Sequence, residues 1–227
     1  MLEEFGPSLY VANGPTVPFF GFPYPTRMAL ARLSSGDVWV WSPIALTQEL
    51  AQATDAVGPV RFIVSPNKLH HLFLREWIDR WPDARVYAPP GLARRKPEIR
   101  FDDDLTDVPA QQWAADIDQV IFRGSFVMDE VAFFHRPSRT ALFCDLIQRH
   151  HESTISGWLG ALMRLDGLVG EQGSTPREWR ATFLRRRLAR AALDKVLGWN
   201  AERLLIAHGQ CAKSGANEII RRALSWI

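Results

Sequence analysis

The sequence contains little cysteine and no long apolar run. Only two of its 227 residues are cysteines, Cys144 and Cys211, and two thiols so far apart are weak grounds for a disulfide framework. No apolar stretch reaches the roughly 18 residues that a membrane helix needs. The acidic start, Met1 to Glu4, lacks the apolar core of a secretory signal. These absences predict a cytoplasmic protein with no membrane partner.

The net charge is also small, at +2. The chain therefore has no strong overall electrostatic field to attract nucleic acid, and we expect no nucleic-acid partner. Arginines nevertheless gather between Arg177 and Arg190, on a predicted helix over residues 176–197. Such a basic helix can bind an anionic ligand, nucleic acid or a membrane surface, or it can simply face solvent. The small net charge favours the solvated face.

The chain is long enough to bury a core as one domain over residues 1–227, with 47 % hydrophobic residues. Periodicity and turn residues predict strands at 8–12, 28–33, 38–41, 60–64, 85–87, 119–122, 131–134, 140–144 and 204–207, and helices at 47–56, 72–80, 155–165, 176–197 and 215–226. Three prolines and a glycine predict a loop over 18–25, whose aromatic residues suit either a lid or core packing. This order favours two packed sheets with helices outside, or an α/β sandwich.

Four stretches resemble the metallo-β-lactamase superfamily in order and spacing. They are Pro66-Asn67-Lys68-Leu69-His70-His71 after a strand, Gly124-Ser125 with the strand leading to His135, Cys144-Asp145-Leu146 after another strand, and Ala207-His208-Gly209 after a late strand. Shorter motifs, including Ser42-Pro43-Ile44 and Pro89-Pro90-Gly91-Leu92, are similar to an uncharacterised branch of that superfamily, a domain of unknown function. The resemblance covers roughly residues 8–227 and implies an αββα four-layer sandwich of metallo-β-lactamase type.

The same resemblance implies that the usual two-metal site is incomplete. Pro66 and Lys68 stand where the superfamily has its first two histidine ligands, and Gly124-Ser125 stand near the third. Proline has no side-chain donor and protonated lysine has no lone pair. The first metal position is therefore predicted to be absent.

The second metal position is better preserved. By the resemblance, His70, His71, Asp145 and His208 converge there, and three imidazoles with a carboxylate suit one zinc or iron ion per chain. The alternative is that no metal binds and the adjacent histidines cap, hydrogen-bond or face solvent. Four protein ligands make a closed site, whereas a hydrolase keeps a position for water, so a bound metal would not by itself prove catalysis.

The candidate catalytic residues are Asp145, His71 and Lys68. The Lys68 ammonium could occupy the vacated first position and replace the lost cation beside Asp145, or it could point to solvent. His135 with Arg139 could line the same cleft or only close a turn. His150 and His151 are predicted to be exposed loop histidines.

Two functions are about equally favoured. One is a mononuclear metal hydrolase acting on a small ester, amide or phosphoester. The other is a catalytically degenerate module that binds a small molecule or regulates through the same cleft. A third is an oxidoreductase that uses iron at the same ligands. Fold alone does not choose among them, because function depends on the site.

Overall fold

The computed structural model describes residues 1–19, 22–152, 157–171 and 173–227. The chain divides into two compact units. Unit 1 comprises residues 1–119 and 135–138, and unit 2 comprises residues 120–134 and 139–227. The single domain expected over residues 1–227 stays a prediction beside this division.

Unit 1 is built on a seven-stranded sheet in the order β1-β2-β3-β4-β5-β6-β7. Its strands are β1 (Glu3–Gly6), β2 (Leu9–Phe19), β3 (Phe22–Arg32), β4 (Val38–Trp41), β5 (Val60–Val64), β6 (Arg85–Ala88) and β7 (Asp103–Asp104). Strands β1 to β4 pair antiparallel, and β4 to β7 pair parallel. The carboxyl ends of β4, β5 and β6 therefore lie at one edge of the sheet.

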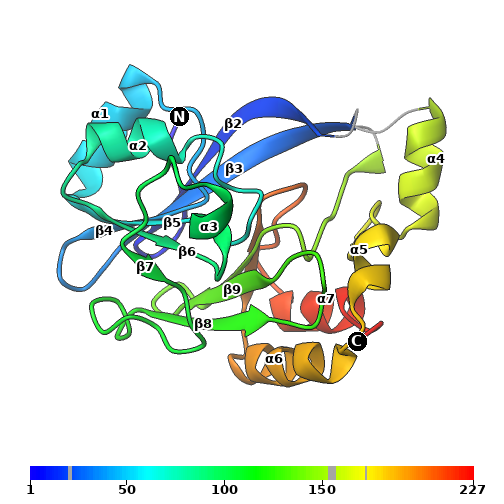
Figure 1. Cartoon of the computed structure of the whole chain (residues 1–227). Helices are drawn as coiled ribbons and strands as arrows, with labels where there is room; N and C mark the ends of the chain where they lie inside the picture. The colour runs from blue at the N-terminus through cyan, green and yellow to red at the C-terminus, as the bar shows by residue number, and fades with distance from the viewer. Residues whose placement is uncertain (20–21, 153–156, 172) are drawn as a thin grey trace. The chain divides into compact units, whose positions relative to one another are not determined.

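Parallel neighbours need crossover connections, and helices provide them. Helix α1 (Gln48–Val57) joins β4 to β5, and α2 (Leu74–Arg80) joins β5 to β6, on the same side of the sheet (Figure 1). The short α3 (Leu92–Arg95) follows β6. As predicted, Thr47 caps α1, its hydroxyl oxygen accepting the N–H of Leu50 at 3.2 Å. Under these helices lies an apolar core that includes Leu30, Ile63 and Trp77, all fully buried.

The loop predicted over residues 18–25 is wrong for the residues that the structure describes. Strands β2 and β3 continue as an antiparallel pair, with Pro18 opposite Pro23 and Thr16 opposite Pro25. Antiparallel ladders alternate between pairs that exchange hydrogen bonds and pairs that do not. Pro23 and Pro25 are two residues apart, so they belong to the same kind of pair. Both fit the pairs that exchange no hydrogen bonds, where the N–H that proline lacks would make no bond in the ladder. Residues 20–21, at the centre of the predicted lid, lie outside the described residues.

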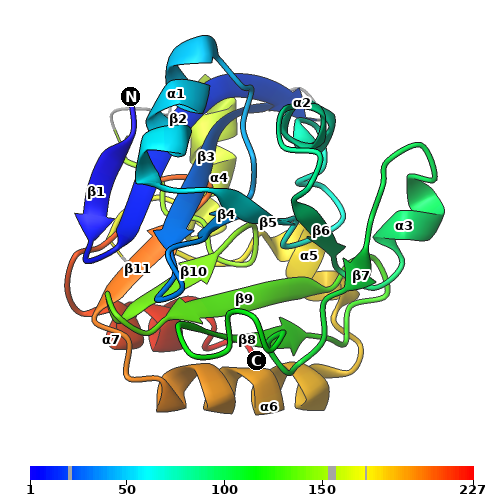
Figure 2. The ribbon, with the colours of Figure 1, turned by 90° about the vertical axis from the view of Figure 1, so that its left-hand side faces the viewer.

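Unit 2 is built on a four-stranded sheet in the order β11-β10-β9-β8. Its strands are β8 (Ile117–Phe122), β9 (Glu130–His135), β10 (Thr140–Phe143) and β11 (Arg203–Ile206), and its helices are α4 (Gly157–Leu165), α5 (Arg177–Thr182), α6 (Arg186–Gly198) and α7 (Ala216–Ala223). Figure 2 shows α6 and α7 on the same face of this sheet. Strands β10 and β11 are parallel, so their carboxyl ends share an edge. Cys144, just past β10, is fully buried and takes part in no disulfide among the described residues, as expected of a small apolar residue.

The single helix predicted over residues 176–197 is also wrong, because it breaks at residues 183–185 into α5 and α6. Phe183 is buried and forms an isolated antiparallel bridge with Ser125. The N–H of Arg185 donates to the carbonyl of Gly124 at 3.2 Å. These contacts, remote in sequence, replace the helical hydrogen bonds at the break. No described helix is both long and apolar enough to span a membrane.

Candidate functional site

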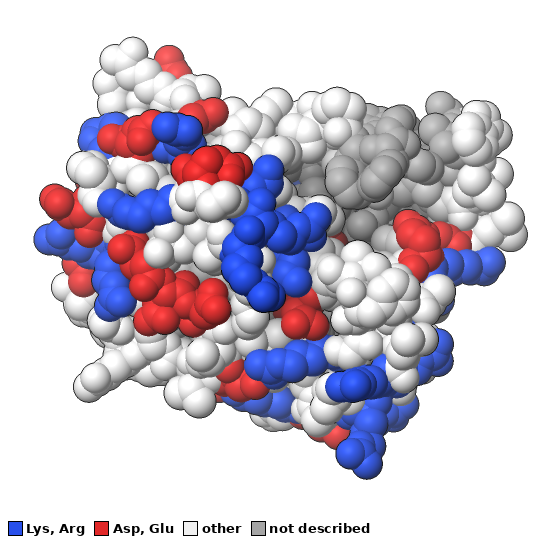
Figure 3. Space-filling model, in the orientation of Figure 1, with Lys and Arg blue, Asp and Glu red and all other residues white. Residues whose placement is uncertain are grey.

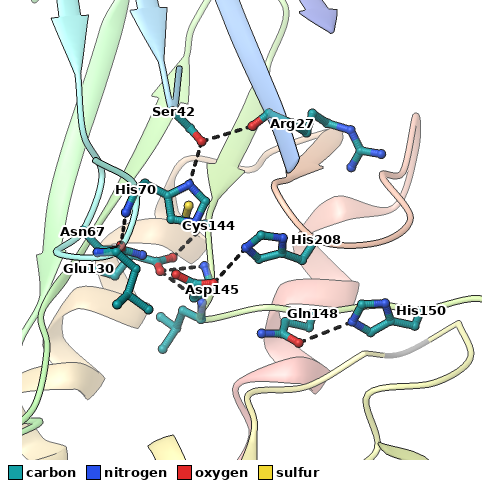
Figure 4. A network of polar contacts seen from close by, with 12 residues as sticks. Arg27, Ser42, Asn67, His70, Glu130, Cys144, Asp145, Gln148, His150 and His208 are labelled. Carbon is teal, nitrogen blue, oxygen red and sulfur yellow. Dashed lines mark hydrogen bonds and ion pairs between the residues drawn. The ribbon is translucent and has the colours of Figure 1, made fainter. Parts of the chain in front are cut away.

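The loop after β5 carries His70 (Figure 4) and is held by short side chains. The Ser65 hydroxyl lies 2.9 Å from the carbonyl oxygens of both Asn67 and His70. The buried Asn67 amide oxygen accepts the N–H groups of Leu69 at 2.8 Å and His70 at 3.3 Å. This local network, typical of an Asx turn, fixes the backbone where His70 projects.

The tautomer of His70 follows from its hydrogen bonds. The Ser42 hydroxyl donates its one proton to the carbonyl of Arg27 at 3.1 Å, so it accepts a hydrogen bond from Nδ1–H of His70 at 2.8 Å. Nδ1 therefore carries the proton and Nε2 carries the lone pair. Ser42 has a φ of 53°, a left-handed conformation that is uncommon outside glycine. A hydrogen-bond acceptor for the other ring N–H is how proteins commonly orient a ligating histidine.

His71 and Lys68 lie on the same loop. Nδ1 of His71 is 3.1 Å from the carbonyl oxygen of Lys68, and burial lowers the pKa of His71, with the nearby Lys96 charge acting in the same direction. His71 is therefore neutral near pH 7. The Lys68 ammonium lies over Gly91, 3.6 Å from the point that a Cβ there would occupy. The expected place of Lys68 beside Asp145 stays a prediction.

In unit 2 the structure brings together two predicted site residues. Asp145 follows β10 and His208 follows β11, and these strands are parallel, with Phe143 opposite Ile206. Nε2 of His208 lies 3.0 Å from Oδ1 of Asp145 (Figure 4). Both side chains are buried. The prediction that these two residues lie within about 10 Å of each other is confirmed.

Sequence reasoning missed Glu130, the residue that holds the Asp145 loop. Its fully buried carboxylate accepts three consecutive backbone N–H groups, those of Cys144 at 2.9 Å, Asp145 at 2.8 Å and Leu146 at 3.1 Å (Figure 4). The signal in the sequence was an acidic residue at the start of an apolar strand. A carboxylate buried there needs hydrogen-bond donors, which points to a structural role.

The loop after β11 is held by Arg149. Its side chain is buried and donates to the carbonyl oxygens of Glu171 at 2.9 Å and Gln210 at 3.0 Å. Gly209, next to His208, has a φ of 109°, and a Cβ there would lie 1.9 Å from the Arg149 carbonyl oxygen. The position beside His208 therefore accepts only glycine.

The remaining histidines, His135, His150 and His151, differ in burial. His150 was expected to be exposed, which is wrong: it is 8 % exposed, and burial lowers its pKa to about 4. His151 is exposed, as predicted. His135 is buried in unit 1, with Nδ1 2.7 Å from the Ser138 hydroxyl. Arg139 forms an ion pair with Glu202 at 2.7 Å, so it joins the turn after β9 to the start of β11.

The sequence profile of one protein family, described as a domain of unknown function (DUF4336), matches residues 19–156. The chain belongs to the DUF4336 family. That stretch includes the His70 loop, Glu130 and Asp145, while His208 lies beyond it. No curated protein matches this DUF4336 chain.

Solved structures extend the comparison to the whole chain. A metallo-β-lactamase from Pontibacter korlensis aligns with a TM-score of 0.66 and 12 % identity over 100 % of this chain and 97 % of its own. The metallo-β-lactamase FIM-1 from Pseudomonas aeruginosa, in its mono-zinc form, aligns with a TM-score of 0.65 and 10 % identity, over 100 % and 93 %. The Flv1 flavodiiron core from Synechocystis sp. PCC6803 aligns with a TM-score of 0.65 and 10 % identity, over 100 % and 60 %.

Identities this low show the fold alone. The DUF4336 chain is a mixed α/β protein with two sheets and has the metallo-β-lactamase fold. The predicted fold class and the predicted family resemblance are thereby confirmed.

Proposed function

We propose that this DUF4336 chain is a metal-dependent hydrolase that holds one metal ion on His70, Asp145 and His208. The observation that carries the proposal lies in unit 2, where Nε2 of His208 and Oδ1 of Asp145 are 3.0 Å apart and both side chains are buried. His70, on the loop after β5 in unit 1, is the third ligand of the proposal. His71, the fourth predicted ligand, stays a prediction.

The donor set suits zinc or iron. Two imidazoles and one carboxylate are common ligands of both ions. Two ligand atoms bound to one zinc at about 2.0–2.2 Å and at a tetrahedral angle lie roughly 3.3–3.6 Å apart. The 3.0 Å between His208 Nε2 and Asp145 Oδ1 is close to that separation. Little movement would be needed for both atoms to bind one ion.

The surroundings of the ligands support the same proposal. The Ser42 hydrogen bond leaves the lone pair of His70 on Nε2, and Glu130 fixes the backbone of Asp145 through its N–H. Metal ligands oriented by hydrogen bonds of this kind lose less freedom on binding.

The count of ligands bears on catalysis. Three protein ligands leave a coordination position open, as catalytic zinc sites do, whereas the four predicted ligands together would close the site. A metal held this way supplies Lewis-acid polarisation of a carbonyl or phosphoryl oxygen. We propose a small ester, amide or phosphoester as the substrate.

Metal content tests the proposal directly. The protein is purified without chelators or metal-affinity steps, and bound metals are measured by mass spectrometry. We expect close to one zinc or iron per chain, lost in His70→Ala and His208→Ala and kept in His151→Ala, whose side chain is exposed. Hydrolysis of a panel of p-nitrophenyl esters and phosphates should be lost with the ion. Two metals per chain, or one that survives both substitutions, would contradict the assignment.

The second candidate function is a binding module without a metal. The contact between His208 and Asp145 favours it, because each of these buried polar groups already has a partner. This candidate predicts no metal uptake from zinc-containing buffer and no hydrolysis of the panel. The variant His71→Ala tests whether His71 is a fourth metal ligand. A site of four ligands that includes His71 should lose its metal in this variant, whereas the proposed site of three ligands should keep it.

A further inference from the structure

A cluster of basic side chains lies beside the His70 loop, within unit 1. Four basic residues, Lys68, Arg94, Arg95 and Lys96, come from this loop and from α3 with the residue after it. In Figure 3 basic atoms gather over α3. Arg94 and Arg95 are exposed and Lys68 is half-buried. The cluster therefore presents positive charge to solvent.

Two of these cations converge on one point. The Lys68 Nζ and an Arg94 terminal nitrogen each lie 3.6 Å from the position that a Cβ on Gly91 would occupy. The two nitrogens are thus at most about 7 Å apart, near the span of one tetrahedral anion with its hydrogen bonds. Like charges this close repel each other, and an anion between them removes that cost.

The neighbouring carboxylates do not neutralise this pair. Lys96 pairs with Glu98 at 3.6 Å, Arg100 with Asp102 at 3.5 Å and Arg85 with Asp103 at 3.8 Å. Within the described parts of the chain, the side chains of Lys68, Arg94 and Arg95 make no hydrogen bond and no ion pair. The nearby carboxylates therefore pair with other cations, and the charges of Lys68, Arg94 and Arg95 are not neutralised by an ion pair among the described residues.

We propose that Lys68 and Arg94 form a binding site for the phosphoryl group of a small phosphorylated ligand. A phosphate monoester carries close to two negative charges near neutral pH, which matches an ammonium with a guanidinium. The guanidinium offers a planar fork of donors to phosphate oxygens, and the ammonium acts as a point charge. If this ligand is also the substrate, the inference rests on the proposed hydrolase function. It then narrows the substrate of that hydrolase to phosphoesters.

A small ligand fits the surroundings better than a nucleic acid. Glu98, Asp102 and Asp103 lie on the segment just after α3, where they would repel further phosphates of a polyanion. The net charge of the whole chain is only +2. Lys68 is two residues before His70, so the same loop would carry the phosphoryl contact and a proposed metal ligand.

Calorimetric titration with inorganic phosphate and with phenyl phosphate tests the site, first on protein dialysed against EDTA. We expect both anions to bind without metal, and Lys68→Gln and Arg94→Gln each to weaken binding roughly tenfold or more. Arg32→Gln is the control. Arg32 is exposed and faces Val38 at the start of β4, at the opposite end of the parallel strands from the loop after β5. Binding should be unchanged in this variant and should weaken in high salt.

The outcomes separate the two proposals. Phosphate binding that depends on Lys68 and Arg94 in a chain that takes up no metal upholds the anion site and overturns the metal-dependent hydrolase. If the chain takes up metal but does not bind phosphate, the anion site alone is overturned. The same holds if phosphate binds equally well to Lys68→Gln and to the parent chain. A single-stranded DNA oligonucleotide that binds more tightly than phenyl phosphate at 150 mM salt, and is lost in the same variants, would overturn the small-ligand assignment.

Discussion

At the scale of single residues, the chain from Arg27 through Ser42 to His70 shows how one hydroxyl sets a histidine tautomer. Replacing Ser42 with alanine removes the acceptor that keeps the proton on Nδ1 of His70. We expect zinc affinity to fall roughly tenfold or more, as it does when other hydrogen-bond partners of metal ligands are removed. Competition with a chelating dye measures this, and Ser225→Ala, an exposed serine on the last turn of the chain, is the control. Equal affinities would contradict the role assigned to Ser42.

His135 makes stability depend on pH. Burial lowers its pKa to about 4, against the small opposing effect of Asp116, while an unfolded histidine titrates near 6.5. The unfolded chain therefore binds more protons between these values, so the stabilisation is complete above pH 6.5 and falls as the pH drops toward 4. The expected loss over this window is about 3 kcal/mol.

Urea unfolding at pH 7 and pH 4.5 measures this dependence. The variant His135→Gln should lose less stability between the two pH values than the parent, because its buried side chain does not titrate. His151→Gln, at an exposed histidine, should keep the parent's dependence. His150 has the same direction of pKa shift, so part of the acid sensitivity should remain in His135→Gln.

At the scale of elements, the break between α5 and α6 depends on a close backbone approach. Gly124 has a φ of 114°, and a Cβ there would lie 2.5 Å from the carbonyl oxygen of Arg185. Gly124→Ala should cost about 2–4 kcal/mol in the free energy of unfolding, from backbone strain together with the clash. Gly198→Ala at the end of α6, where nothing lies within 4 Å, should be neutral or stabilising. Thermal unfolding of both variants checks the contrast.

The elements also show what the sequence predicts and why. The strand at residues 60–64 and the helix capped by Thr47 follow from local periodicity and capping, so both were predictable. The paired strands across residues 18–25 and the break at 183–185 depend on partners far along the chain, which no local pattern contains.

The site divides in the same way. Asp145 and His208 were predictable because each directly follows a strand and the family resemblance pairs those strands. Glu130 and the hydrogen bond of Ser42 were not, because their partners are chosen by tertiary structure. Buried His150 was wrongly expected at the surface, since a polar run such as Arg149-His150-His151-Glu152 gives no sign of burial.

At the scale of the whole molecule, a metal that binds only the folded chain should stabilise all of it. At a zinc concentration 100 times the dissociation constant, the gain is about 2.7 kcal/mol. For a chain of this length the midpoint of thermal unfolding should rise by roughly 5–10 °C. EDTA should reverse the rise, His208→Ala should abolish it, and His151→Ala should keep it. A rise of equal size in His208→Ala would argue that zinc binds elsewhere.

The Glu130 carboxylate has one more consequence for chemistry. Backbone N–H groups directed at one negatively charged oxygen are a common way for hydrolases to build an oxyanion hole. Here the chain fills that arrangement with its own side chain, since the N–H groups of residues 144–146 all donate to Glu130. These amides cannot also stabilise an oxyanion on a substrate. Any negative charge that develops in the proposed hydrolysis would have to be stabilised by a metal ion or by cationic side chains.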